Sequence, residues 1–402
     1  MTTRADLIIV GAGLAGSAAA RAASARGLDV VVLEAFAPGH RNGSSHGSAR
    51  IFRRAYPDPL YVRLTGTARE LWRQLEDQSG ERLLTLTGGI DFGAVRDPRL
   101  LHEVLTSCGV PAELLEPEAA AERWPYFDFT GAGQVMFHAD SGVLDPHNAM
   151  AAMLRLAAAN GADIRFGTQV TRLEPTPAGD GAVAYTDSGT FTAPVIAVAA
   201  GAWIAPLLDG VVKLPPLAVT QQPVFHFAPA SARENTVPAR ENTVSARENT
   251  VSAKGNTGPA DPWPIFVCVD GTDNCYGLAG GRDGEVPGAI KIGGHEGSRT
   301  TTAADRDFVV DPAARAQITG FVGRRIPGLN PAPVNEVTCL YTGTANEDFV
   351  LDRSGPFVVA SPCSGHGAKF APLLGEIIAD LAAGKPAPDP RFTLAAHGVT
   401  RG

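Results

Sequence analysis

The first 34 residues constrain the fold of this chain more than any other segment. Residues 6–10 are a short β-branched apolar run, which is typical of a buried parallel strand. A glycine-rich turn at 11–16 and an alanine-rich segment at 17–26 follow, and the second of these predicts a helix. A second strand is expected at 29–33, and Glu34 ends it. This order predicts the first βαβ unit of an α/β fold.

The glycine-rich turn has the residues that a dinucleotide-binding site requires. Gly11 permits a tight turn, Gly13 lets backbone N–H groups approach a pyrophosphate, and Gly16 lets the helix pack close to the strand. The N-terminus of the helix presents free N–H donors and the positive end of its dipole to phosphates. Glu34 stands at the spacing at which a carboxylate accepts hydrogen bonds from ribose hydroxyls. This motif alone does not distinguish FAD from NAD.

Composition and charge exclude several classes of protein. Lys plus Arg total 34 and Asp plus Glu total 42, a net charge of −8, so the chain lacks the basic surface of a nucleic-acid binder. The five cysteines include no C-x-x-C pair, and this pattern predicts free thiols. It argues against a disulfide framework and against a metal site. No apolar run reaches the ~18 residues that span a bilayer. We therefore expect a cytoplasmic globular chain without a membrane partner.

The rest of the chain predicts that the dinucleotide-binding fold is interrupted and later resumes. Further helices are expected at 63–75, 148–160, 311–326 and about 372–383. Further strands are expected at 85–92, 134–137, 163–166, 170–173, 182–186, 191–199, 265–269, 275–278, 289–293 and 357–360. The strands after residue 264 are expected to belong to a second sheet.

Residues 231–258 consist of a seven-residue repeat. Ser-Ala-Arg-Glu-Asn-Thr-Val at 231–237 recurs at 238–244, with Pro first, and at 245–251, and a degraded copy fills 252–258. Each unit offers only Ala and Val as apolar groups, which excludes a coiled coil, and four units are too short for a solenoid. We expect a solvated, poorly ordered loop between strands. A partner-binding loop is the alternative.

Six segments in order along the chain carry a more specific pattern. They are the N-terminal glycine motif and residues 42–50 (NGSSHGSAR), 123–125 (RWP), 201–203 (GAW), 337–342 (VTCLYT) and 364–370 (SGHGAKF). Together they resemble the monomeric sarcosine oxidase / N-methyltryptophan oxidase family of flavoenzymes. The resemblance covers nearly the whole chain apart from the repeat.

The resemblance implies an α/β fold made of two interleaved domains. A Rossmann-like FAD-binding domain of the glutathione-reductase type is expected from residues 1–82, 146–214 and 338–402. An α+β substrate domain on a mixed, largely antiparallel sheet is expected from residues 83–145 and 215–337. The family also implies a monomer, with a dimer as the alternative.

For the cofactor, the resemblance implies FAD joined through a cysteine thioether, and Cys339 stands at the matching position. The alternative is that Cys339 is a small buried strand residue, as free cysteines often are. Attachment requires a thiolate, which nearby cations favour, and the residues matching His46 and Arg50 lie near the linkage in the family. The other implied cofactor contacts are Gly11, Gly13, Leu14, Gly16, Glu34, Ser45, Val170, Gly201, Trp203, Gly365, Gly367 and Lys369.

For the substrate, the resemblance implies an amino acid with a secondary amine. Arg53 and Lys369 stand at the positions that hold its carboxylate, and a guanidinium with an ammonium is a suitable carboxylate clamp. Tyr276 and Tyr341 match hydroxyls that line the family's pocket, although core tyrosines with satisfied hydroxyls are the alternative. Ala368 and Cys363 are departures from the family pattern, and they leave the particular substrate open.

For the reaction with oxygen, Lys291 matches a family lysine that promotes it, and His295 matches an active-site histidine. A buried cation would stabilise the negative charge that develops on O₂. The alternatives are a strand lysine that faces water and a structural histidine. The implied reaction is hydride transfer to flavin N5, hydrolysis of the resulting imine, and reduction of O₂ to H₂O₂.

Three other functions are kept as alternatives. The first two are a D-amino-acid- or glycine-oxidase-like enzyme with non-covalent FAD, and an amine dehydrogenase that passes electrons to another acceptor. The third is a non-catalytic flavin-binding scaffold that acts through the repeat loop.

Overall fold

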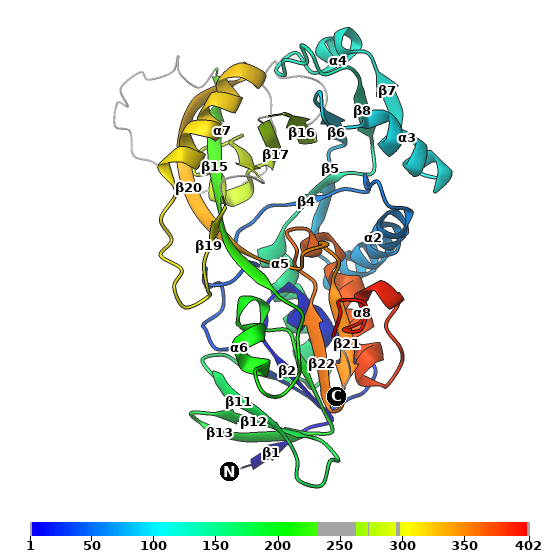
Figure 1. Ribbon diagram of the computed structural model, residues 1–402, viewed down its shortest axis with the longest axis vertical. Coiled ribbons are helices and arrows are strands. Elements are labelled where there is room, and N and C mark those ends of the chain that lie inside the picture. The colour runs from blue at the N-terminus through cyan, green and yellow to red at the C-terminus, as the bar shows by residue number, and fades with distance from the viewer. Residues whose placement is uncertain (1, 231–262, 272, 295–297, 400–402) are drawn as a thin grey trace, which may run out of the picture.

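The computed structural model describes residues 2–230, 263–271, 273–294 and 298–399 (Figure 1). The repeat at 231–258 lies outside the described residues, so its expected conformation stays a prediction. The long strands β15 (Ala218–Pro229) and β20 (Leu329–Gly343) pair with each other and run between the upper and lower parts of the molecule in Figure 1. No helix in the described part of the chain is long and apolar enough to cross a membrane.

The lower part is built on a six-stranded sheet that confirms the predicted α/β fold class. Its order is β10-β3-β2-β14-β22-β21, and every pair is parallel except β21 with β22. The strands are β2 (Leu7–Val10), β3 (Val30–Leu33), β10 (Asp163–Arg165), β14 (Val195–Val198), β21 (Val350–Ser354) and β22 (Phe357–Ser361). Three pairs of neighbouring strands in this sheet come from distant parts of the chain, namely β10 with β3, β2 with β14, and β14 with β22. The Rossmann-like sheet is therefore interrupted along the sequence, as expected.

The two faces of this sheet are covered differently because side chains alternate along each strand. Helix α1 (Leu14–Ser24) packs against both α5 (Pro146–Ala159) and α8 (Ala371–Ala382), and α1 and α8 share a core with Leu7 and Ile9. Ile8 and Val10 instead pack against a four-stranded sheet, β1-β13-β12-β11. Its strands are β1 (Thr2–Arg4), β11 (Val170–Pro175), β12 (Ala182–Thr186) and β13 (Gly189–Ala193).

The single strand predicted at 191–199 is wrong. The structure divides it into β13 and β14, which belong to different sheets and are separated by Pro194. Proline has no N–H to donate to a ladder, so the chain leaves one sheet there and enters the next. The apolar run itself continues through both strands, and for this reason the sequence pattern did not reveal the break.

The upper part is built on a second sheet, which is mixed and largely antiparallel as expected. Its order is β19-β15-β18-β17-β16-β6-β8-β7, with β20 also paired to β15, and only β6 with β16 is parallel. The strands not yet given are β6 (Gly89–Phe92), β7 (Glu113–Leu115), β8 (Val135–His138), β16 (Ile265–Asp270), β17 (Asp273–Ala279), β18 (Ile290–Gly294) and β19 (Arg299–Thr300). Its core is rich in aromatic side chains, among them Phe92, Trp124 and Phe266.

The remaining elements surround these sheets. A small sheet joins β4 (Arg50–Phe52), β9 (Gly142–Leu144) and β5 (Leu84–Leu86). The other helices are α2 (Pro59–Ser79), α3 (Pro98–Ser107), α4 (Pro117–Arg123), α6 (Ile204–Leu208) and α7 (Pro312–Arg325). The domain boundaries expected at residues 82, 145, 214 and 337 stay a prediction.

Candidate active site

The glycine-rich turn between β2 and α1 leaves no room for side chains at two positions. Gly11 has a φ of 99°, and a Cβ there would lie 2.6 Å from the carbonyl oxygen of Ala199. A Cβ on Gly16 would lie 1.8 Å from the carbonyl oxygen of Gly11, so only glycine permits this contact between helix and turn. Gly13 precedes α1 without a side-chain cap, and the Leu14 N–H donates to Ser45 Oγ at 3.1 Å.

Glu34 stands at the end of β3, beside the same turn. Its carboxylate accepts hydrogen bonds from the N–H of Ala12 at 2.7 Å and of Phe36 at 3.0 Å, and it is 6% exposed. The turn and the acid therefore meet at the carboxyl ends of β2 and β3. In a parallel sheet this edge is where dinucleotides bind.

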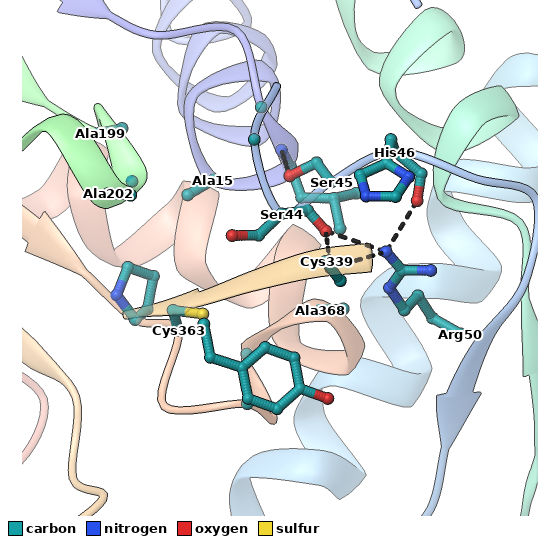
Figure 2. Close-up of a pocket in the computed structure, with 18 of the residues that line it drawn as sticks. Ala15, Ser44, Ser45, His46, Arg50, Ala199, Ala202, Cys339, Cys363 and Ala368 are labelled. Carbon is teal, nitrogen blue, oxygen red and sulfur yellow. Dashed lines mark hydrogen bonds between the residues drawn. The ribbon is translucent and has the colours of Figure 1, made fainter. Parts of the chain in front are cut away.

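One cavity of about 1210 Å³ begins at this edge and brings the predicted site residues together. Every predicted site residue that the structure describes lines it, except Gly16, which is buried behind the turn. Val170, Gly201 and Trp203 lie along one part of its wall, where Ala202 is visible in Figure 2. His295 lies outside the described residues, so its role stays a prediction. The cavity is large enough for a dinucleotide with a small substrate beside it.

Cys339 lies in the wall of the cavity beside the loop that carries Ser44 and His46 (Figure 2). Its Sγ is 3.5 Å from the carbonyl oxygen of Ser44 and 3.6 Å from Nη2 of Arg50. The same Nη2 donates to the carbonyl oxygens of Ser44 at 2.9 Å and His46 at 2.7 Å, which fixes the guanidinium against the thiol. The sulfur of Cys339 and the guanidinium of Arg50 are therefore held together at the wall of the cavity.

His46 contributes an unpaired polar atom to this cavity. Its Nε2 is buried and has no hydrogen-bond partner among the residues that the structure describes. Burial, with the charges of Arg50, Lys291 and Arg306 nearby, lowers the pKa of His46 to about 2, so the ring is neutral. A buried polar atom without a partner is costly, and a bound polar group would remove this cost.

Arg306 is a structural residue of the site that sequence reasoning missed. Its Nη1 donates to the carbonyl oxygens of Arg41 at 2.7 Å and Asn42 at 2.9 Å. Its Nη2 donates to Thr338, the neighbour of Cys339. Arg306 thus ties the loop before His46 to the strand of the thiol. It belongs to none of the matched segments, so no sequence signal pointed to it.

Arg53, which is half-buried, and Lys369, which is buried, form a pair of cations in another part of the cavity. Lys369 is 4% exposed, and its Nζ donates to the carbonyl oxygen of His366 at 2.6 Å and to the hydroxyl of Tyr56 at 2.9 Å. The guanidinium of Arg53 lies 4.8 Å from the centre of the Tyr56 ring. Burial lowers the pKa of both cations, and the charge of Arg53 lowers that of Lys369 further.

No ion pair joins Arg53 or Lys369 to an acidic side chain in the described part of the chain. Two neighbouring charges of one sign without a direct ion pair are unfavourable away from water, and an anion bound between them would remove this cost. Tyr56, which contacts both, was also missed. Its hydroxyl lies 3.0 Å from Nδ1 of His366, and its only sequence signal is its place three residues after Arg53.

Lys291 is buried, so the alternative of a strand lysine that faces water is wrong. It is 5% exposed, and its Nζ donates to the carbonyl oxygen of Ala49 at 3.1 Å. Both neighbours, Ile290 and Ile292, are buried on the opposite face. Burial, followed by the charge of Arg50, lowers the pKa of Lys291 to about 7.

Tyr276 and Tyr341 lie together in the wall of the cavity, with their hydroxyl oxygens 3.3 Å apart. Burial raises the pKa of both, and that of Tyr341 strongly, so both hydroxyls stay protonated. A Cβ on Gly365 would lie 2.8 Å from the Tyr341 ring, and one on Gly367 would lie 1.7 Å from the carbonyl oxygen of Pro362. The two glycines therefore let the 364–367 loop approach this wall.

FAD fits the donor set of the cavity. The N-terminus of α1 would hold the pyrophosphate, and Glu34 would hold the ribose. Ser45 and the buried Nε2 atom of His46 would offer further polar contacts to the bound cofactor. The loop at 364–367 leads into the short helix Gly367–Phe370 and then α8, whose N-terminal end favours negative charge.

Comparisons with known proteins show the family to which the chain is similar. Residues 6–381 match the DAO family, described as FAD dependent oxidoreductases. The chain is 32% identical over 387 residues to monomeric sarcosine oxidase of Streptomyces avermitilis, covering 94% of this chain and 93% of that protein. It is also 32% identical over 395 residues to N-methyl-L-tryptophan oxidase of Yersinia pestis, covering 95% and 96%.

Two solved structures show the same fold. The open form of NikD, an unusual amino acid oxidase essential for nikkomycin biosynthesis, superposes with a TM-score of 0.81 at 25% identity and covers 97% of both chains. L-proline dehydrogenase from P. horikoshii superposes with a TM-score of 0.79 at 19% identity and covers 100% of both chains.

Proposed function

The chain belongs to the DAO family of FAD-dependent oxidoreductases, and we propose that it oxidises the secondary amine of an N-methyl or cyclic amino acid. FAD is held covalently through Cys339, O₂ accepts the electrons, and H₂O₂ is the second product. The observation that carries the proposal is that Arg53 and Lys369 line the cavity that fits FAD and that neither forms an ion pair with an acidic side chain in the described part of the chain. Burial lowers the pKa of both cations, and the carboxylate of a bound amino acid supplies a direct counter-charge.

The residues of the chain position the substrate and hold the charges. The substrate carboxylate accepts two parallel hydrogen bonds from the guanidinium of Arg53 and a third from the ammonium of Lys369. The same ammonium donates to the hydroxyl of Tyr56, which helps to position it. FAD, when bound, supplies the redox chemistry by accepting a hydride equivalent from the carbon next to the amine nitrogen. The protonated hydroxyls of Tyr276 and Tyr341 offer donors to the bound substrate.

Lys291 serves the reaction with O₂. Its ammonium is held by the carbonyl oxygen of Ala49 in a buried site, where a positive charge stabilises the negative charge that develops on O₂. We expect Lys291→Met to lower the rate of reoxidation by O₂ by about 10²- to 10³-fold, and to leave anaerobic reduction of the flavin by substrate nearly unchanged. Stopped-flow absorbance measures both half-reactions.

The pH dependence of reoxidation provides a second test of this role. Since the pKa of Lys291 is about 7, its charge is present below this pH and is lost as the pH rises through it. The reoxidation rate of the wild type should therefore fall as the pH rises, while Lys291→Met should show no such fall. Equal slowing of both half-reactions in the variant would contradict the assignment.

The proposed function is tested by release of H₂O₂ from the purified holoenzyme. Sarcosine, N-methyl-L-alanine, N-methyl-L-aspartate and L-proline are supplied in parallel, with glycine and D-alanine as primary amines. We expect turnover of secondary amines and little of primary ones. A preference for primary amines would support the glycine- or D-amino-acid-oxidase alternative. Reduction of a dye without consumption of O₂ would identify a dehydrogenase.

A further inference from the structure

The cavity continues beyond Arg53 and Lys369 to a third cation, Arg96. Arg96 lies in the loop after β6, and its N–H donates to the carbonyl oxygen of Val269 at 3.0 Å, so its backbone is fixed to the second sheet. Asp91, on β6, fixes its side chain. Nε and Nη2 of Arg96 both donate to Oδ1 of Asp91, at 2.9 Å and 2.5 Å. Asp91 is 0% exposed, so this anchor is rigid.

This anchor leaves the outer edge of the guanidinium free for another partner. Both bonds to Asp91 use one carboxylate oxygen, and Nη1 of Arg96 makes no hydrogen bond to any residue that the structure describes. The side chain of Arg96 is 17% exposed and lines the cavity. Its charge contributes to the lowered pKa of Arg53, which places the two guanidinium groups in one electrostatic cluster.

The other charged groups at this end of the cavity do not supply that partner. Arg391 is paired with Asp58 at 2.5 Å and with Asp348 at 2.7 Å, so these three charges form a closed group. Glu347 is exposed at the cavity and has no ion pair in the described ranges. Its charge acts on Arg53, the neighbouring cation of the carboxylate clamp.

Asp91 already balances the charge of Arg96, but one substrate carboxylate leaves the outer edge of this guanidinium without a hydrogen-bond acceptor. A carboxylate held between Arg53 and Lys369 offers them both their counter-charge, and the free edge of Arg96 still faces the cavity. A substrate with an apolar side chain would remove water from this edge without replacing the lost hydrogen bonds, which is unfavourable. A second carboxylate would accept a pair of parallel N–H bonds from it, the arrangement that guanidinium groups favour.

We propose that Arg96 binds a second acidic group of the substrate, so that the substrate class is an N-alkyl or cyclic amino acid with two carboxylates. This inference rests on the proposed function and deepens it, because it concerns the part of the same cavity that the first carboxylate leaves open. Arg96 is then a specificity-determining residue, and Asp91 is the positioning residue that aims it.

The test compares substrates with one and with two carboxylates in the wild type and in Arg96→Met. Sarcosine and N-methyl-L-alanine represent the first class, and N-methyl-L-aspartate and iminodiacetate the second. We expect the wild type to prefer the second class, and Arg96→Met to lower kcat/KM for it by about 10- to 100-fold, mainly through KM. For the first class the value should stay within about twofold.

Two further variants control for folding and for general charge. Arg99→Met removes an exposed arginine three positions away, which donates to Gln134 at 2.8 Å outside the cavity, and it should leave both classes unchanged. Arg96→Lys keeps a cation beside Asp91 but lacks the planar guanidinium that forms two parallel hydrogen bonds. This variant should fold, and it should still lose much of the preference for substrates with two carboxylates. An equal loss for both classes in Arg96→Met and Arg96→Lys would show that the Asp91–Arg96 pair is structural and would overturn the inference.

Binding without turnover separates this inference from the proposed function. The flavin absorbance of the holoenzyme is titrated with succinate and with acetate, neither of which is oxidised. Tighter binding of succinate, by at least about tenfold and only when Arg96 is present, supports the second carboxylate site. Equal affinities overturn it, even where secondary amines are oxidised. Failure of every secondary amine to release H₂O₂, with succinate still preferred, would instead reject the proposed function alone.

Discussion

Arg53→Met and Lys369→Met are each expected to lower kcat/KM for the best secondary amine by about 10²- to 10³-fold, because each removes one of two charges that hold the substrate carboxylate in a buried site. Lys369 is 4% exposed, and neither cation has an acidic partner in the described chain, so bulk water does not replace the lost contact. Steady-state kinetics measure the effect, and most of it should appear as a higher KM.

The pH dependence distinguishes the two cations. Burial and the charge of Arg53 place the pKa of Lys369 well below its usual range, so its charge is lost as the pH rises through that lowered value. KM of the wild type should then increase with pH, whereas a guanidinium in Lys369→Arg stays charged and should flatten the profile. Lys213→Met, which removes an exposed lysine, is the matched control. A wild-type KM in both Arg53→Met and Lys369→Met would show that the carboxylate binds elsewhere.

The parts of the fold that were predicted correctly are those that short-range patterns determine. Residues 6–34 contain the whole strand, turn, helix and strand in order, and the structure has each of them. Glycines at 11 and 16 are required by contacts inside this unit, so the motif and its geometry can be inferred together. The strand at 191–199 failed because its apolar run does not show which sheet each half joins.

The parts of the site that were not predicted depend on contacts between distant segments. Arg306 meets the carbonyl of Arg41 across 265 positions, and Lys369 meets the Tyr56 hydroxyl across 313 positions. Neither Arg306 nor Tyr56 belongs to a periodic pattern or a motif. Their roles follow from where the fold places the two loops that carry them, and the pattern of a single sequence does not show this.

The burial of Lys291 shows the same limit. Alternation along 290–292 indicates that Lys291 and its isoleucine neighbours face opposite sides, and this is correct. The pattern predicts a solvent-facing lysine only if that side of the sheet is open. Here β18 lies inside the second sheet, and the segment with Ala49 covers the lysine face. A polar residue in a strand therefore marks the cavity side of the sheet as readily as the outer side.

Cys339→Ser is expected to leave no flavin on the acid-precipitated chain, whereas the wild type keeps it. The Sγ of Cys339 lies 3.6 Å from the guanidinium of Arg50 in the wall of the cavity, and in the proposed enzyme this sulfur would form the bond to the flavin 8-methyl position. A serine hydroxyl does not ionise under these conditions, so the variant binds FAD without a covalent bond. Fluorescence of the denatured chain and the mass of the peptide that contains residue 339 measure the difference.

Cys363→Ser is the matched control, because Cys363 lines the same cavity (Figure 2). Burial raises the pKa of the Cys363 thiol, which disfavours its thiolate, and its replacement should leave attachment unchanged. Arg50→Met should slow attachment while Cys339 stays present, which tests the role of the cation separately. Flavin on the peptide of Cys363, or free FAD released by acid from the fully loaded wild type, would contradict the assignment to Cys339. The second result would favour the non-covalent oxidase, in which Cys339 is a buried strand residue.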